Sequence, residues 1–452
     1  MGAFNINVIV CLLICCAFNY STAQTAKPKI FEVIKYGAKG DGVTDDYRAI
    51  QNCINEALKI HSSKIIFGPG TYRVSKGLIA QYIDNDLEIT GVVQGKKFPT
   101  IACSAPVSVL AVRGYLEPKS LGNITLTKMN IKGYFDKFPY SASNPFVRKP
   151  IWYYGLSITD KRKAVLDQVN ISNIYGQGIY ISTTQQLNIP LESRFQNVVV
   201  TNCKINNCWG YNPKADDYGD GIYISNVSSG LIKNNIINNN FFQTKQLGRC
   251  GIVIEFMAEK CIISNNQIFG YDRGIHIEAD YGDHTVEKNK IFGSDMGIVL
   301  SNQFINGHNS PVRILNNLIS NQGLPKSNNL KRTRDITTVS DRSLLNFVAE
   351  KGARGGSIIS GNTLIIYGNY DYFSNAIVNI KSDELLITDN EYRVIKSNLL
   401  SHPIKFFNYS NSLPTNDTFS GVSIIQFKKN RVKTKLFIEK NNKMNGTKIE
   451  LN

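Results

Sequence analysis

Five acidic residues have the types and spacing that acid–base chemistry requires. Glu255 and Glu278 occupy the same place in two copies of one repeated pattern, and Asp280 follows Glu278 by two residues. Asp217 and Asp220 lie in an acidic stretch just before another copy. Two carboxyl groups held close together do not both ionise freely, so one can donate a proton while the other acts as a base or nucleophile. The candidate catalytic residues are Glu255, Glu278, Asp280 and Asp220.

Basic, aromatic and imidazole side chains accompany these acids. Arg273 and His276 share a segment with one of them, and Tyr223 lies in an earlier copy of the pattern. A guanidinium pairs with an anionic group, and a His or Tyr side chain can bind a ligand or transfer a proton. An aromatic-rich run over residues 134–154 offers Trp152 as a flat surface on which a ligand ring can stack. The candidate substrate-binding residues are Arg273, His276, Tyr223, Asp217, His284 and Trp152.

A repeated pattern of the Gly-Ile-x-Ile type must position these side chains. Its copies alternate apolar and outward residues, as strands do, and are bounded by Gly, Asn and Asp turns. A unit this short cannot bury its own apolar face, so the repeats must stack as coils around one shared core. The pattern therefore predicts a parallel β-solenoid. Its copies begin at Gly178, Gly221, Gly251, Gly274 and Gly297.

The register of these copies predicts which side chains meet on the surface. Tyr223 lies between two core isoleucines, so alternation turns it toward solvent. Glu255 should lie beside Glu278, because stacked coils are ~4.8 Å apart. Asp280 should share the outward face of Glu278, at ~6.6 Å for two residues of rise. The residues before each glycine form a further outward column, which comprises Gln177, Asp220, Cys250, Arg273 and Met296.

A second series places asparagine before x-apolar pairs. Asparagine at a turn between stacked strands can hydrogen-bond the backbone and the asparagine of the next coil. We interpret this series as a structural ladder at one corner. Its members are Asn235, Asn266, Asn289, Asn317, Asn362 and Asn430.

The beginning of the chain differs from the repeats. Residues 36–46 read Tyr-Gly-Ala-Lys-Gly-Asp-Gly-Val-Thr-Asp-Asp, and residues 47–60 carry apolar side chains at helical spacing. A helix here would cover the open end of the solenoid. This block, with the later Pro-Gly-Thr-Tyr, resembles the N-terminal signature of the pectate-lyase-like superfamily, which includes polygalacturonases, rhamnogalacturonases and epimerase-like proteins. The resemblance implies an all-β, right-handed parallel β-helix with a short N-terminal capping helix.

The polygalacturonase signatures are largely absent. Residues 218–221 (Tyr-Gly-Asp-Gly) are similar to the first of them, Asn-Thr-Asp-Gly. Arg249-Cys250 stands at the Asp-Asp position, Arg273 at the His position, and residues 299–301 replace Arg-Ile-Lys. A looser resemblance is to ι-carrageenases, in which a Glu-x-Asp triplet carries the acid and the base. Residues 278–280 (Glu-Ala-Asp) match that triplet.

Composition and charge limit the classes of molecule that the protein can bind. The 452 residues carry 51 Lys+Arg against 35 Asp+Glu, a net charge of +16. An apolar run before Ser-Thr-Ala predicts a signal peptide over residues 1–23, hence a secreted or extracytoplasmic protein with one β-helix domain over residues 24–452. No apolar run reaches the ~18 residues that a membrane span requires, and no nucleic-acid motif is recognised. A basic secreted scaffold favours an anionic polysaccharide as partner.

Three functions fit these residues. The first is a glycoside hydrolase with a carboxylate acid/base pair and no cofactor; its carboxyl separation is ~5 Å for retention and ~6.5–9.5 Å for inversion. The second is a lyase or epimerase of a uronate polymer, in which Asp220, Glu255 and Glu278 bind Ca²⁺ and an Arg or His side chain is the base. The third is a non-catalytic glycan-binding surface protein.

Overall fold

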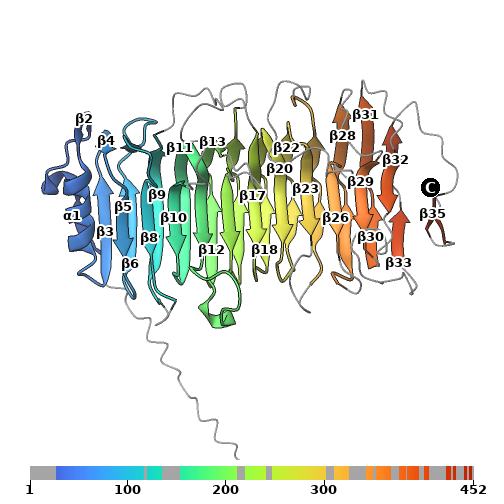
Figure 1. The fold of residues 1–452 in the computed structure, drawn as a ribbon, viewed down its shortest axis with the longest axis horizontal. Helices are drawn as coiled ribbons and strands as arrows, with labels where there is room; N and C mark the ends of the chain where they lie inside the picture. Colours follow the sequence, from blue (N-terminus) through green and yellow to red (C-terminus); the bar gives the residue numbers. More distant parts are fainter. Residues whose placement is uncertain are drawn as a thin grey trace, which may run out of the picture.

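Neighbouring coils pair in parallel along the whole length of a computed structural model (Figure 1). The structure describes residues 27–116, 120–134, 153–210, 219–240, 247–301, 310–324, 343–349, 353–367, 376–382, 384–395, 402–406, 424–428, 431–433, 442–444 and 447–449. The predicted signal peptide lies outside these ranges. In the described part of the chain, no helix is both long enough and apolar enough to cross a membrane.

Each complete coil contributes one strand to each of three walls. The first sheet contains β1 (Lys29–Glu32), β3 (Ser62–Phe67), β6 (Asp86–Gly91), β9 (Asn123–Lys132), β11 (Lys163–Ser182), β12 (Asn197–Thr201), β15 (Gly230–Lys233), β18 (Cys261–Ser264), β21 (Thr285–Glu287), β24 (Arg313–Leu315), β27 (Ser357–Ser360), β30 (Glu384–Thr388) and β33 (Ile424–Lys428).

The second sheet continues from the first around a corner, and β9 and β11 run through both. Its other strands are β2 (Asp41–Asp45), β4 (Thr71–Val74), β7 (Thr100–Cys103), β13 (Lys204–Trp209), β16 (Ile236–Asn238), β19 (Gln267–Phe269), β22 (Lys290–Phe292), β25 (Leu318–Ser320), β28 (Thr363–Tyr367), β31 (Glu391–Ile395) and β34 (Arg431–Lys433).

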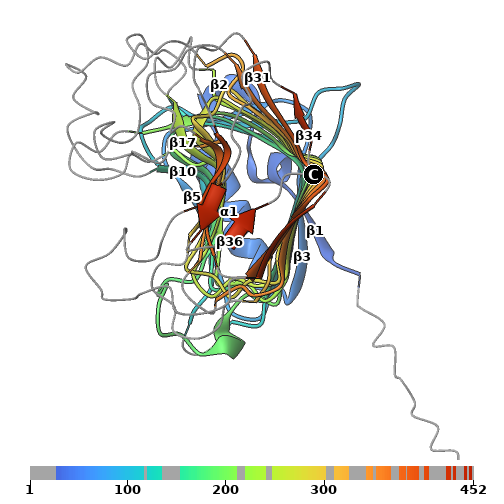
Figure 2. The same cartoon turned by 90° about the vertical axis from the view of Figure 1, so that its right-hand side faces the viewer.

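The third sheet contains the Gly-Ile-x-Ile repeats, and the end of β11 also belongs to it. Its other strands are β5 (Leu78–Gln81), β8 (Leu110–Arg113), β10 (Tyr153–Thr159), β14 (Ile222–Ser225), β17 (Gly248–Glu255), β20 (Tyr271–Glu278), β23 (Met296–Ser301), β26 (Leu345–Val348), β29 (Ala376–Lys381) and β32 (His402–Phe406). Seen along the axis, β5, β10 and β17 form one wall and β1 and β3 another (Figure 2).

Alternation along the strands builds the core between these walls. In β3, for example, buried and partly exposed residues alternate strictly. The inward isoleucines and valines of the three sheets join one continuous apolar cluster. The predicted parallel β-solenoid is therefore confirmed. A short antiparallel hairpin, β35 (Asn442–Met444) and β36 (Thr447–Ile449), is separate from the stack.

A helix lies at the end of the stack where the chain begins (Figure 1). Helix α1 (Tyr47–Ala57) buries Ile50, Cys53 and Ile54 against the core. It ends three residues before the predicted limit. The carboxylate of Asp46 accepts hydrogen bonds from the backbone N–H groups of the preceding turn, at 2.7 and 3.0 Å, instead of capping the helix. Two short 3₁₀ helices complete the described elements: η1 (Val33–Tyr36) and η3 (Leu191–Ser193).

The asparagine ladder forms at the corner between the first and second sheets. The side-chain amide of Asn289 donates to the side-chain oxygen of Asn317 at 3.0 Å and to a backbone carbonyl of the previous coil at 2.8 Å. Asn235, Asn266 and Asn317 repeat this arrangement, all fully buried. The structural interpretation is confirmed. The ladder continues from Asn362 to Asn390, which the sequence series missed, and Asn430 lies outside the described residues.

The six cysteines in the described part of the chain are all buried, and none of them is in a disulfide. They are Cys53, Cys103, Cys203, Cys208, Cys250 and Cys261.

Candidate active site

The two glutamates of the repeat lie side by side on the third sheet. Glu255 ends β17 and Glu278 ends β20, and the two are register partners on adjacent parallel strands. Both side chains are half-buried, whereas Asp220 and Asp280 are fully buried. The predicted neighbourhood of Glu255 and Glu278 is confirmed, and they are the acids of the cluster that a ligand can reach.

Burial in this wall changes the acidity of Glu255. Desolvation, reinforced by the charge of Glu278, raises the pKa of Glu255 to about 7, although a hydrogen bond from Tyr223 and the charge of Arg249 work against this shift. Glu278 has a different polar neighbour, because its Oε2 atom lies 3.3 Å from Nε2 of His276. The two carboxyl groups therefore have different surroundings, as an acid and a base require.

Tyr223 supports Glu255 from the neighbouring coil. Its hydroxyl donates to the Glu255 carboxylate and accepts a hydrogen bond of 3.0 Å from the amide of Gln186. Its ring stacks on Tyr180, with centroids 5.1 Å apart, and Tyr180 also contacts Tyr154 at 4.8 Å. Tyr223 belongs to a small cluster outside the main core, yet only 4% of it is exposed. The prediction that it faces solvent is therefore wrong, because stacking and the hydrogen bond cover it.

Asp220 is held by Arg249, which is not among the site residues predicted from the sequence. Arg249 donates from Nε to Oδ1 of Asp220 at 2.8 Å and from Nη2 to Oδ2 at 2.6 Å, and Gln177 donates to Oδ2 at 2.7 Å. Both oxygens of Asp220 are thus engaged and the side chain is fully buried. Asp220 is therefore not available as the predicted catalytic acid; it pairs with Arg249, whose charge acts on Glu255.

The column before the glycines is shielded from solvent. Arg273 is 2% exposed and its Nη1 atom lies 3.8 Å from Sγ of Cys250, its register partner. His276 is 7% exposed. Arg273 is thus buried in the wall, five residues before Glu278 on the same strand, and His276 is buried with its Nε2 atom 3.3 Å from Glu278.

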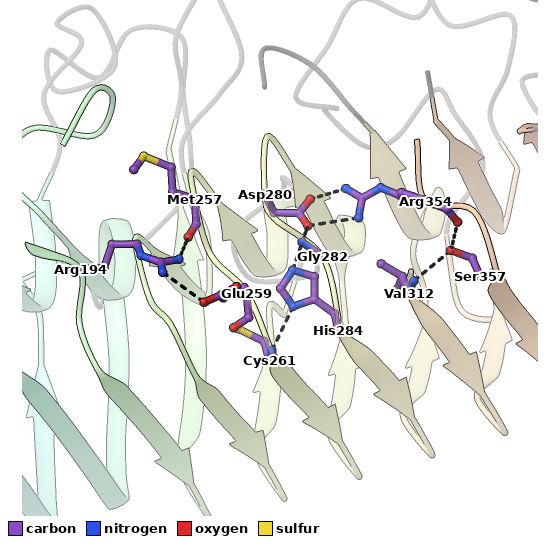
Figure 3. A network of polar contacts seen from close by, with 10 residues as sticks. All are labelled: Arg194, Met257, Glu259, Cys261, Asp280, Gly282, His284, Val312, Arg354 and Ser357. Atoms are coloured by element: carbon purple, nitrogen blue, oxygen red, sulfur yellow. Dashed lines mark hydrogen bonds and ion pairs between the residues drawn. The ribbon is translucent and has the colours of Figure 1, made fainter. Parts of the chain in front are cut away.

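Asp280 does not share the outward face of Glu278, contrary to prediction. Ala279 has a φ of 51°, which ends the strand and turns the next side chain inward. Arg354 binds both oxygens of Asp280, and His284 donates from Nε2 to Oδ1 at 2.9 Å (Figure 3). Nδ1 of His284 accepts from the backbone N–H of Cys261 at 3.0 Å, which leaves Nε2 as the ring nitrogen that carries a proton.

This buried network removes two residues from the predicted site. Asp280 and His284 are fully buried, and the Arg354 guanidinium holds the pKa of Asp280 well below its usual range despite desolvation. The Glu-Ala-Asp triplet therefore does not place two carboxylates on one face. Asp217 and Trp152 lie outside the described residues.

The acids do not form a calcium site in the described part of the chain. No three His, Cys, Asp or Glu side chains gather there as a metal would require. Asp220, a ligand in the lyase hypothesis, has both oxygens paired with Arg249 and Gln177. The residues present therefore do not fit the proposed Ca²⁺.

Two family models match parts of this chain. A model described as right handed beta helix region matches residues 141–319, and one described as rhamnogalacturonase A/epimerase, pectate lyase-like matches residues 30–92. No curated protein matches the sequence.

Solved structures share the fold at low identity. The mannuronan C-5 epimerase AlgE6 A-module of Azotobacter vinelandii has a TM-score of 0.50 and 16% identity, over 83% of this chain and 98% of its own. The N-terminal fragment of gene product 12 of bacteriophage phi29 has a TM-score of 0.56 and 15% identity, over 83% and 65%. DFA-IIIase of Arthrobacter chlorophenolicus has a TM-score of 0.51 and 10% identity, over 91% and 100%. The two family models and the stacked parallel coils support the resemblance of this chain to the pectate-lyase-like superfamily and show the fold of a right-handed parallel β-helix.

Proposed function

We propose that the protein is a secreted carbohydrate-active enzyme that hydrolyses glycosidic bonds of an acidic polysaccharide. The observation that carries this proposal is a pair of carboxyl groups: Glu255, with a pKa of about 7, lies beside Glu278 in register on the next coil. A carboxyl group with this pKa holds its proton near neutrality and can still transfer it, as glycoside hydrolysis requires.

Each carboxyl group has a defined role in this mechanism. Glu255 donates its proton to the leaving oxygen, and Tyr223 stabilises the carboxylate that results, because its hydroxyl already points at that group. Glu278 is the second carboxylate, acting on the anomeric carbon directly or through water, with His276 orienting its Oε2 atom at 3.3 Å. Arg249 adds positive charge on the side of Glu255 where negative charge develops.

Charge and fold support the substrate class. The net charge of +16 favours a polyanion. The AlgE6 A-module, which has the same fold, is named as an enzyme that acts on mannuronan. We therefore propose a carboxylated or sulfated polysaccharide and no metal requirement.

The test is an assay of the purified chain on a panel of pectic, alginate-type and sulfated polysaccharides. Hydrolysis releases reducing ends without the ultraviolet absorbance of unsaturated sugars. Glu255→Gln and Glu278→Gln should each lower kcat/KM by about 10²–10⁴-fold. Glu287→Gln is the matched control, since Glu287 lies in β21 of the first sheet. Unsaturated products would identify elimination instead. No activity on any of the polymers would favour a non-catalytic glycan-binding function.

A further inference from the structure

A polar groove lies on the outer side of the second sheet, in the first coils of the stack. Its volume is about 460 Å³, within the ~300–1,000 Å³ of small-ligand sites. Thr71, Thr100, Asn130 and Asn170 line it, and each is the register partner of the next on β4, β7, β9 and β11. The groove floor is therefore a row of hydroxyl and amide side chains, one per coil.

One side of the groove is a tight hairpin between β6 and β7. Gln94 and Lys97 exchange backbone hydrogen bonds of 3.1 and 3.0 Å, and Gly95 supplies the positive φ of 62° that such a turn requires. The backbone carbonyl of Phe98 accepts a 3.1 Å hydrogen bond from the side-chain amide of Asn130. This bond ties the hairpin to the floor, so the groove is a built feature of the fold.

The lining has the chemistry of an anionic sugar site. Among the described residues that line it, the charged ones are Lys96 and Lys97, both exposed. The amides of Asn130 and Asn170 form a chain with Thr100, at 2.9 and 3.1 Å, and such groups both donate to and accept from sugar hydroxyls. Phe98 offers an apolar surface for a sugar ring.

The row of polar residues on the groove floor continues along the axis of the solenoid. Lys204 is the register partner of Asn170, so a polymer lying along the row meets another ammonium group one coil, or ~4.8 Å, further on. The groove is separate from the pair of glutamates, because β17 lies in the third sheet and β31 and β34 of the second sheet lie in another wall (Figure 2).

We propose that this groove is a second binding site for an anionic segment of a polysaccharide. Lys96 and Lys97 bind carboxylate or sulfate groups, and the amide row binds hydroxyls. The ligand class follows from the groove itself, so the proposal stands whether or not the glutamates on the third sheet are catalytic.

A lysine-acetylation footprint of the full chain tests the proposal. The protein carries Glu255→Gln so that its ligands stay uncut, and the probes are galacturonate and sulfated carrageenan oligosaccharides. We expect either anionic probe to slow acetylation of Lys96 and Lys97 while leaving the exposed Lys260 and Lys288 unchanged. Which of the two probes protects identifies the anionic group. A neutral cello-oligosaccharide and inorganic sulfate serve as comparisons.

The matched variants are Lys96→Ala/Lys97→Ala and Lys260→Ala/Lys288→Ala, which remove the same charge. Titration calorimetry should show roughly tenfold weaker binding at one site only in the first variant, because charge-assisted hydrogen bonds are lost. Equal binding by both variants, equal protection by the neutral oligosaccharide, or equal protection by inorganic sulfate alone overturns the proposal. A circular dichroism spectrum confirms that each variant is folded.

Discussion

Glu255 and Glu278 are register partners on neighbouring strands; the hydroxyl of Tyr223 donates to Glu255, and Nε2 of His276 lies 3.3 Å from Oε2 of Glu278. This asymmetry between two otherwise equivalent positions of the repeat distinguishes a proton donor from its partner. It also makes the pair testable through its pH dependence.

We expect kcat/KM to fall above pH about 7, because Glu255 must be protonated and its pKa lies at about 7. Tyr223→Phe removes a hydrogen bond that favours the ionised carboxylate, so the pKa of Glu255 should rise and the alkaline limb should move to higher pH. The measurement is a pH profile of kcat/KM for both proteins. If the alkaline fall in kcat/KM occurs at the same pH in Tyr223→Phe, Tyr223 does not affect the pKa of the catalytic acid.

The same group affects stability in a predictable direction. Because its pKa is raised in the folded protein, the Glu255 carboxyl group is protonated to a greater extent in the folded state than in the unfolded state. The free energy of unfolding therefore falls as the pH rises from 4.5, the ordinary pKa of a glutamate, to about 7, the pKa of Glu255 in the folded protein. Glu255→Gln should remove this loss and raise the free energy of unfolding at pH 8 by about 1–3 kcal/mol relative to the parent, with little change at pH 4. Urea denaturation at both pH values checks it.

The Asp280–Arg354 pair should be essential to folding. Arg354→Met leaves a fully buried carboxylate without its cation, which costs about 3–5 kcal/mol. The control is Arg313→Met, which breaks an exposed pair with Asp283 and should cost ~0–1 kcal/mol. Because the pKa of Asp280 is lowered, the contribution of this pair is present above the ordinary aspartate range and is lost as the pH falls through and below it. Denaturant titrations of the two variants that coincide at neutral pH would contradict this assignment.

A chelator should leave the activity unchanged. Asp220 is already paired with Arg249, so the described acids lack the ligands that Ca²⁺ prefers. The assay compares rates in EDTA and in added calcium. Loss of activity in EDTA, restored by calcium, would point to the lyase or epimerase mechanism.

The stereochemistry of cleavage should be retention. Adjacent strands are ~4.8 Å apart, which is closer to the ~5–5.5 Å carboxyl separation of retaining enzymes than to the wider inverting separation. Proton NMR of the first product identifies the anomer before mutarotation. An inverted product would require room for a water between Glu278 and the anomeric carbon.

Much of the fold could be predicted because it depends on local alternation. The Gly-Ile-x-Ile copies correctly place Glu255 beside Glu278, and the asparagine series correctly predicts a buried ladder. Asn390 does not belong to the series read from the sequence because Tyr392 takes the place that Ile, Leu or Val holds in the other copies, although its interval of 28 residues from Asn362 is regular. These successes share one cause: strand register and turn chemistry repeat at every coil.

The candidate site was harder, because its details depend on contacts between distant residues. Asp280 turns inward because Ala279 adopts a positive φ, and alanine carries no sequence signal for that conformation. Its partner Arg354 comes from another part of the chain, as Arg249 does for Asp220. Alternation predicts on which face of a strand a side chain lies, but it does not predict which charged side chains will pair on that face.

The asparagine ladder has a consequence for how such a molecule can diversify. The interval from Asn266 to Asn289 is 23 residues and that from Asn317 to Asn362 is 45, yet the amide bonds measure 3.0 and 2.9 Å. The corner thus keeps one pitch while the chain between its rungs nearly doubles in length. Segments can therefore be inserted between coils without changing how the coils stack. The loops that contact a ligand and the core that stabilises the fold can then change independently in sequence.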